Sequence, residues 1–294
     1  MIATILLIFI GGLVRAAGAG LGCPDWPQCF GMWIPPTTAS ELPAGYDATL
    51  FNPLHTWLEY VNRLVGVVIG LLITATFALS FRYRKEDPVV TISSGVAFVL
   101  VLFQGWLGGQ VVKSGLEAGM ITIHMVVAML ILSVLLFATF RAMNRRLQIT
   151  ISPTVKKKLL WVAGIIFLLT MVQMVLGTQV REQVDIAKNV LNLERENWLE
   201  SMDVLYAIHR SFSWLLVIAT GGLVWLQQRA GVHRRLQATG WIVTVLILFQ
   251  MLLGLGMDRL GMPGALQVLH LTSVAILICA EMIFILITRF SQTE

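Results

Sequence analysis

Long apolar segments dominate this sequence. Of its 294 residues, 57% are hydrophobic and only 13% are charged, whereas soluble domains carry about 25% charged residues. Most of these segments reach the roughly 20 residues that a helix needs to cross a bilayer. They cover residues 2–19, 55–81, 89–112, 119–141, 159–180, 204–227, 237–257 and 264–288. The sequence therefore predicts an all-α integral membrane protein with eight transmembrane helices.

Lysine and arginine are unevenly divided between the connecting loops. The even-numbered loops and the C-terminal tail hold thirteen of them, whereas the odd-numbered loops hold six. Because loops rich in Lys and Arg remain in the cytoplasm, we expect both termini to be cytoplasmic. The net charge of +5 follows from this topology, so we expect the lipid bilayer as a partner and no nucleic acid.

The chain is an internal duplication. His209 follows Asn62 by 147 residues, and His270 follows His124 by 146 residues. The pattern Phe-Gln-x-x-Leu-Gly at residue 103 recurs at residue 249. Four predicted helices in each half, with copies that keep the same orientation, favour a pseudo-two-fold axis along the membrane normal. We therefore expect two four-helix bundles, residues 1–147 and 148–294.

Two histidines of the second half are candidates for a haem site. His209 and His270 begin equivalent helices at similar depth near the outer face of the membrane. Two inward-facing imidazoles at matched depth can ligate one haem iron, although a lone histidine can also be a hydrogen-bonded packing residue. Arg210 could pair with a haem propionate, or it could extend its charge to the interface.

The first half has a different set of residues at the equivalent positions. His124 matches His270, but Asn62 stands where the second half has His209. On a helix, His55, Glu59 and Asn62 share one face. A carboxylate in an apolar helix is a functional candidate by default. We therefore expect Glu59 to act on a molecule bound between Asn62 and His124, with an ion pair to Arg63 as the alternative.

Two loops on the outer side are long. The first is rich in Gly, Pro and Trp, so it cannot be a regular helix; it contains Cys23 and Cys29. An oxidising outer compartment would permit a disulfide between them, and two free thiols or a transient metal site are the alternatives. In the other long loop, residues 183–203 have the pattern of an amphipathic surface helix.

Several of these motifs together resemble one family, haem A synthase, over nearly the whole chain. They are Gly12-Leu13-Val14-Arg15, Gly18-Ala19-Gly20-Leu21-Gly22-Cys23-Pro24-Asp25-Trp26-Pro27-Gln28-Cys29, Glu59-Tyr60-x-x-Arg63, His124, His209-Arg210 and His270. The resemblance implies an oxidoreductase of the cell membrane. It would oxidise the C8 methyl group of haem O to a formyl group by successive hydroxylations, giving haem A for cytochrome oxidase.

The resemblance also implies roles for individual residues. His209 and His270 would ligate the iron of a haem b in the second half, with Arg210 beside it. The first half would take haem O as substrate, with Glu59 as the catalytic residue. Cys23 and Cys29 match the cysteine pair of the family.

One position departs from the family pattern. Where the family usually has Glu-x-x-His-Arg, this chain has Asn62 before Arg63. We therefore expect His124 to hold the substrate haem without an imidazole opposite it, although Asn62 and Arg63 would still adjoin the haem. His55 lies seven residues from Asn62, about 10.5 Å of helix rise. It would then line the outer mouth of the site or bond near a propionate.

Two other functions remain open from the sequence. One is a di-haem b-type cytochrome that only transfers electrons, and the other is a non-catalytic haem carrier or assembly factor. If the chain is a haem A synthase, a haem O synthase and assembly factors of cytochrome oxidase are possible partners.

Overall fold

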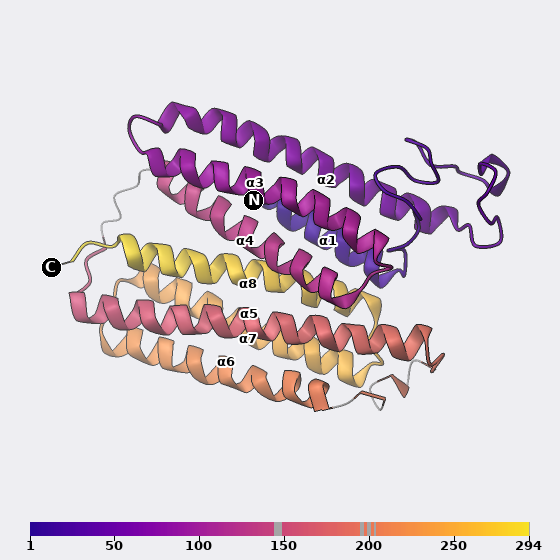
Figure 1. Cartoon of the computed structure of the whole chain (residues 1–294). Helices are drawn as coiled ribbons and strands as arrows, with labels where there is room; N and C mark the ends of the chain where they lie inside the picture. Colours follow the sequence, from indigo (N-terminus) through magenta and orange to yellow (C-terminus); the bar gives the residue numbers. More distant parts are fainter. Residues whose placement is uncertain (144–148, 195–196, 199–200, 203, 294) are drawn as a thin grey trace.

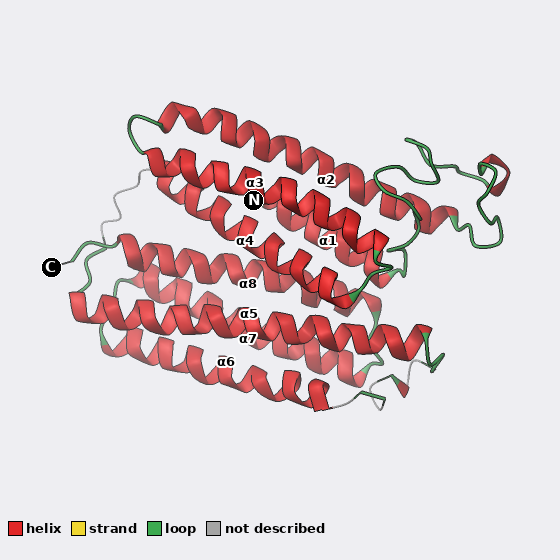
Figure 2. Ribbon diagram, in the orientation of Figure 1, coloured by secondary structure: helices red, strands yellow, loops and turns green. Residues whose placement is uncertain are grey.

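The protein is a bundle of long helices that run side by side (Figures 1 and 2). The computed structural model describes residues 1–143, 149–194, 197–198, 201–202 and 204–293, and these contain no β-strand. The α-helices are α1 (Ile2–Ala16), α2 (Pro53–Ser80), α3 (Pro88–Lys113), α4 (Ala118–Ala142), α5 (Pro153–Asn189), α6 (Val204–Arg229), α7 (Arg234–Arg259) and α8 (Gly264–Phe290). Short 3-10 helices lie at Ala39–Glu41 and Phe81–Tyr83.

Seven of these helices, α2 to α8, are long and apolar enough to cross a membrane. Seven of the eight predicted segments are therefore confirmed as long apolar helices, and the first is a shorter helix. Helix α1 has 15 residues, or about 22 Å at 1.5 Å per residue, and it ends three residues before the predicted segment 2–19. It stops because Gly18 takes a φ of +72°, and the Gly18 and Ala19 N–H groups bond back to the Arg15 and Val14 carbonyls.

Helix α5 is longer than the sequence pattern indicates. It continues without a break to Asn189, over 37 residues, so the first part of the predicted surface helix 183–203 belongs to α5 instead. The chain has no Gly or Pro between Gly177 and Asn189 that would end the helix. The added turns are held by packing, because Val184 and Ala187 are buried against Met262. Parts of 195–203 lie outside the described residues.

The order of the helices in space follows the two predicted halves (Figure 1). In the first half, α2 packs against α1 and α3, and α3 packs against α4; in the second, α5 packs against α6 and α8, and α7 packs against α6 and α8. The halves meet where α8 packs against α1 and α4, and where α4 packs against α5. The boundary at residue 147 stays a prediction, since residues 144–148 lie outside the described part.

The contact between the halves is apolar in its middle and charged at one end. A buried cluster joins Met129 and Leu132 of α4 to Ile278 of α8. Near the first long loop, Arg15 of α1 and Arg181 of α5 both pair with Asp185 of α5, at N–O distances of 2.6 and 2.8 Å. One carboxylate therefore joins the two halves at this end.

Candidate functional site

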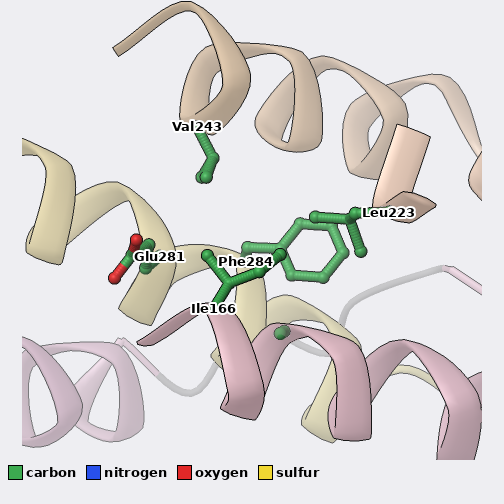
Figure 3. A pocket seen from close by; sticks show the side chains of 6 residues that line it. Ile166, Leu223, Val243, Glu281 and Phe284 are labelled. Carbon is green, nitrogen blue, oxygen red and sulfur yellow. The ribbon is translucent and has the colours of Figure 1, made fainter. Parts of the chain in front are cut away.

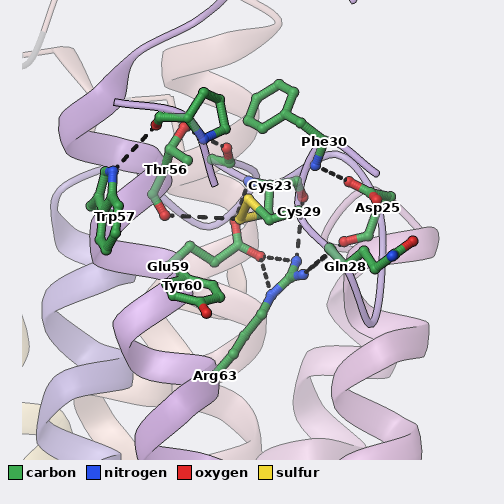
Figure 4. The surroundings of a disulfide bond; sticks show 12 residues. Cys23, Asp25, Gln28, Cys29, Phe30, Thr56, Trp57, Glu59, Tyr60 and Arg63 are labelled. Atoms are coloured by element: carbon green, nitrogen blue, oxygen red, sulfur yellow. Dashed lines mark hydrogen bonds and ion pairs between the residues drawn. A yellow bond between two sulfur atoms is a disulfide. The ribbon is translucent and has the colours of Figure 1, made fainter. Parts of the chain in front are cut away.

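The first long loop is closed by a disulfide between Cys23 and Cys29 (Figure 4). Both cysteines are fully buried. Within the ring that they close, Asp25 accepts hydrogen bonds from the backbone N–H groups of Phe30 and Gly31, at 2.6 and 2.8 Å. The predicted disulfide is confirmed, and Asp25 bonds the ring that it closes to the two residues that follow Cys29.

Helix α2 holds this loop through polar side chains along one face. The Thr56 hydroxyl donates to the Gly22 carbonyl at 2.9 Å. Further along, the Trp57 indole donates to the Pro36 carbonyl at 3.2 Å and the Tyr60 hydroxyl donates to a loop carbonyl at 2.6 Å. The polar residues at the start of α2 therefore bind the first long loop.

Arg63 is the central residue of this contact (Figure 4). Its guanidinium donates to the backbone carbonyls of Asp25 at 2.7 Å, Gln28 at 2.8 Å and Cys23 at 3.3 Å. Two further bonds go to the carboxylate of Glu59. A guanidinium has five N–H donors, so all of them are used. The expected position of Arg63 beside a substrate haem stays a prediction.

Glu59 is buried, with a 4% exposed fraction, and both of its oxygens accept hydrogen bonds. Oε1 pairs with Arg63, one turn along α2, and Oε2 accepts the backbone N–H of Cys23 at 2.8 Å. The ion pair that the sequence left open as an alternative is therefore present. It fixes a carboxylate beneath the disulfide ring, and the catalytic role of Glu59 stays a prediction.

The loop approaches the helices so closely that two glycines are required. A Cβ on Gly22 would lie 2.3 Å from the His55 carbonyl oxygen and 2.8 Å from the Thr56 nitrogen. On the opposite side, a Cβ on Gly109 of α3 would lie 2.9 Å from the ring of Trp26. The disulfide ring is therefore clamped between α2 and α3.

The remaining predicted residues of the first half lie on two helices, α2 and α4. Asn62 faces α1, where its Oδ1 is buried without a hydrogen-bond partner and lies 3.8 Å from the Cβ position of Gly11. His124 of α4 lies against Gly108 of α3, where its ring is 3.6 Å from the position that a Cβ on Gly108 would take. His55 lies in the first turn of α2, partly exposed, and its backbone N–H donates to Asn52 at 3.1 Å.

The second half repeats part of this arrangement. His209 lies against Gly177 of α5, 3.1 Å from the Cβ position, as Asn62 lies near Gly11 in the first half. His209 of α6 and His270 of α8 lie on helices that both pack against α5 and α7. The role of these two histidines as a ligand pair stays a prediction.

The three histidines His124, His209 and His270 share two features. The Nδ1 atom of each is buried without a hydrogen-bond partner. The backbone carbonyl of each accepts a glutamine amide from the preceding helix, at 2.9, 2.9 and 3.1 Å. Since buried polar atoms are normally satisfied, these imidazoles are suited to an additional partner, and a haem iron is a chemically fitting one.

Arg210 has surroundings unlike those of Arg63, its counterpart in the repeat. Its guanidinium lies 5.8 Å from the centre of the Tyr206 ring, and Tyr206 donates to Asp258. The Arg210 side chain is exposed, and among the described residues it forms no ion pair. It is thus available for an anionic group such as a propionate, and that pairing stays a prediction.

Comparison with known proteins identifies the family. Residues 1–282 match the model of the COX15-CtaA family of cytochrome oxidase assembly proteins. The chain belongs to this family. It is 26% identical to the Heme A synthase of Shewanella oneidensis, over 95% of this chain and 91% of that protein. It is 25% identical to the Heme A synthase of Wolbachia pipientis wMel, over 99% of this chain and 91% of that protein.

Two features of this COX15-CtaA family member were not found by reasoning from the sequence. Gln104 and Gln250 were noticed only as markers of the repeat, although each bonds the carbonyl of a histidine 20 residues later. The shared acceptor of Arg15 and Arg181, Asp185, was also missed. The available signal was the recurrence of a glutamine 20 residues before His124 and before His270.

Proposed function

We propose that this chain is a haem A synthase that oxidises the C8 methyl group of haem O to a formyl group, giving haem A. The observation that carries the proposal is the set of three half-buried histidines, each with a buried Nδ1 that has no partner among the described residues and a backbone carbonyl that accepts a glutamine amide. They occur once in the first half and as a pair in the second. This distribution suits one exchangeable haem and one permanently held haem.

In this proposal the second half, residues 148–294, holds a haem b. His209 and His270 would hold its iron, and Arg210 would pair with a propionate. Two strong protein ligands would favour electron transfer over chemistry at the iron. Gln173 and Gln250 bond the carbonyls of these histidines, and they hold the two imidazoles at the correct depth.

The first half, residues 1–147, takes haem O as substrate. His124 would hold the iron of this haem, and Asn62 would add no second strong ligand, because an amide is a poor iron ligand. Arg63 and His55 lie on the outer side of this site. A weaker ligand set suits a haem that must enter, react and leave.

Glu59 acts in the oxidation as a fixed negative charge. In each of two successive hydroxylations a C–H bond of the methyl group would break, two electrons would leave for an external acceptor through the redox chemistry that the bound haem supplies, and a water oxygen would add to the carbon. The resulting diol would lose one water to give the formyl group, and the loss of electrons before the oxygen adds would leave positive charge near the ring. A carboxylate held by Arg63 and the Cys23 N–H cannot reorient, and such preorganised charge is most effective where water is excluded. The disulfide ring covers this site and keeps water out.

The location and partners are part of the same proposal. The chain lies in the cell membrane with both termini in the cytoplasm and both haem sites near the outer face. Haem O synthase delivers the substrate, and the product passes to the assembly of cytochrome oxidase. The lipid bilayer surrounds the apolar helices.

The test is co-expression with a haem O synthase in a host that lacks haem A, followed by extraction and chromatography of the haems. We expect haem A with the wild-type chain and only haem O with the His124→Ala variant. Haem b without any haem A in the wild type would indicate an electron-transfer cytochrome. Haem O that is bound but unchanged in the wild type, with no haem A, would indicate a non-catalytic carrier.

A further inference from the structure

A buried carboxyl group lies in the second half, away from the histidines. Glu281 of α8 has a 3% exposed fraction and lies eleven residues after His270, about 16 Å further along the helix. Its Oε1 accepts the hydroxyl of Thr170 of α5 at 2.6 Å. None of the roles proposed above involves this residue.

The second oxygen of Glu281 faces apolar surroundings (Figure 3). Oε2 is buried and has no hydrogen-bond partner among the residues that the structure describes. Glu281 borders a cavity of about 10 Å³, which is at the lower limit for one water, and the other side chains in its lining are apolar. The cavity is lined by Glu281, Ala163, Ile166, Leu223, Val243 and Phe284.

The surroundings of Glu281 provide little to stabilise a negative charge. Within the described part of the chain it forms no salt bridge, and Thr170 donates the one hydrogen bond that its carboxyl group accepts there. Burial of an isolated carboxylate costs far more than protonation of the group, so such a residue becomes neutral. Glu59 is the opposite case, since it is buried with an arginine and a backbone N–H.

The internal repeat indicates that packing does not require a carboxyl group here. The residue 146 positions before Glu281 is Leu135, which is buried at the equivalent position of α4 with a 6% exposed fraction. An apolar residue therefore fills this position in the first half. The acid distinguishes the second half from the first.

We infer that Glu281 is a proton-binding site within the membrane: a neutral carboxylic acid whose Oε1 is bonded to Thr170 and whose Oε2 is buried without a partner. Carboxyl groups buried in transmembrane helices are the residues from which proton relays are built. The second half thus stores a proton at a position where the first half has leucine. This inference does not depend on the proposed haem chemistry.

Infrared spectroscopy of the purified full-length protein tests the inference, because a protonated carboxylic acid has a C=O stretch well separated from the carboxylate bands. We expect this band in the wild type at neutral pH and its loss in Glu281→Gln. Thr170→Val should shift the band without removing it, because only the hydrogen bond is lost. Glu59→Gln is the matched control and should leave the band unchanged.

Two results would overturn the inference. One is a wild-type spectrum without a carboxylic acid band, and the other is a band that persists unshifted in both Glu281→Gln and Thr170→Val. If Glu281→Gln does not fold, the Thr170→Val shift still decides the question. Glu281→Leu, which copies Leu135, should retain the helical content and thermal stability of the wild type, and its collapse would mean that the acid is required for packing.

Discussion

Replacement of Gly22 by alanine should break the contact between the disulfide ring and α2. The new Cβ would lie 2.3 Å from the oxygen and 2.5 Å from the carbon of the His55 carbonyl. These are backbone atoms of a helical turn, so neither can rotate away. The loop must therefore move outward by about 1 Å to reach ordinary van der Waals distance.

The displacement would weaken two hydrogen bonds beside Gly22. These are the bond from Thr56 to the Gly22 carbonyl, at 2.9 Å, and the bond from the Cys23 N–H to Glu59, at 2.8 Å. Loss of a partner for a buried polar group costs about 1–3 kcal/mol, and overpacking costs about 1–3 kcal/mol more. We expect Gly22→Ala to destabilise the protein by about 2–6 kcal/mol.

The assay is thermal unfolding of the detergent-purified protein together with limited proteolysis of the first long loop. We expect a lower midpoint and faster cleavage of the loop in Gly22→Ala. The matched control is Gly119→Ala at the start of α4, where a Cβ would meet nothing within 4 Å, and this variant should behave as the wild type. A Gly22→Ala protein with unchanged midpoint and cleavage rate would refute the reasoning.

Three further predictions concern the disulfide, the topology and the carboxylate. Alkylation without reductant should leave Cys23 and Cys29 unmodified in freshly isolated membranes, and mass spectrometry that finds both thiols alkylated would contradict the bond. A reporter that works only in the cytoplasm should be active when it is fused after Glu294. Activity of a reporter that works only in the periplasm would contradict the predicted topology. Glu59→Gln should lower haem A formation about 100-fold or more while haem b is retained, and full activity would exclude the role of the charge.

The sequence predicts most of the fold because the membrane imposes simple rules. A helix must be long and apolar to cross the bilayer, and seven predicted segments are such helices. The boundaries were less accurate, since the end of α1 depends on the backbone conformation of Gly18, and the end of α5 depends on packing of Val184 against residues far along the chain. Hydropathy reports neither effect.

The sequence named the residues of the candidate site, but it did not predict most of the contacts that they form. Periodicity placed Glu59 and Asn62 on one face, yet Glu59 bonds the first loop and Asn62 faces α1. The pairing of Arg63 with three loop carbonyls could not be predicted, because backbone acceptors leave no trace in the sequence. The contact of Trp26 with Gly109 could not be predicted for a related reason. Two adjacent glycines in a helix, such as Gly108 and Gly109, can serve several purposes, and the sequence does not say which.

The central claim is that the two halves perform different tasks, and the absorption spectrum of the purified reduced protein without haem O tests it most directly. We expect the spectrum of a low-spin haem b with two histidine ligands in the wild type and in His124→Ala. The same signal should disappear in His209→Ala and in His270→Ala. Unchanged low-spin haem b in both of these variants, or its loss in His124→Ala alone, would contradict the account.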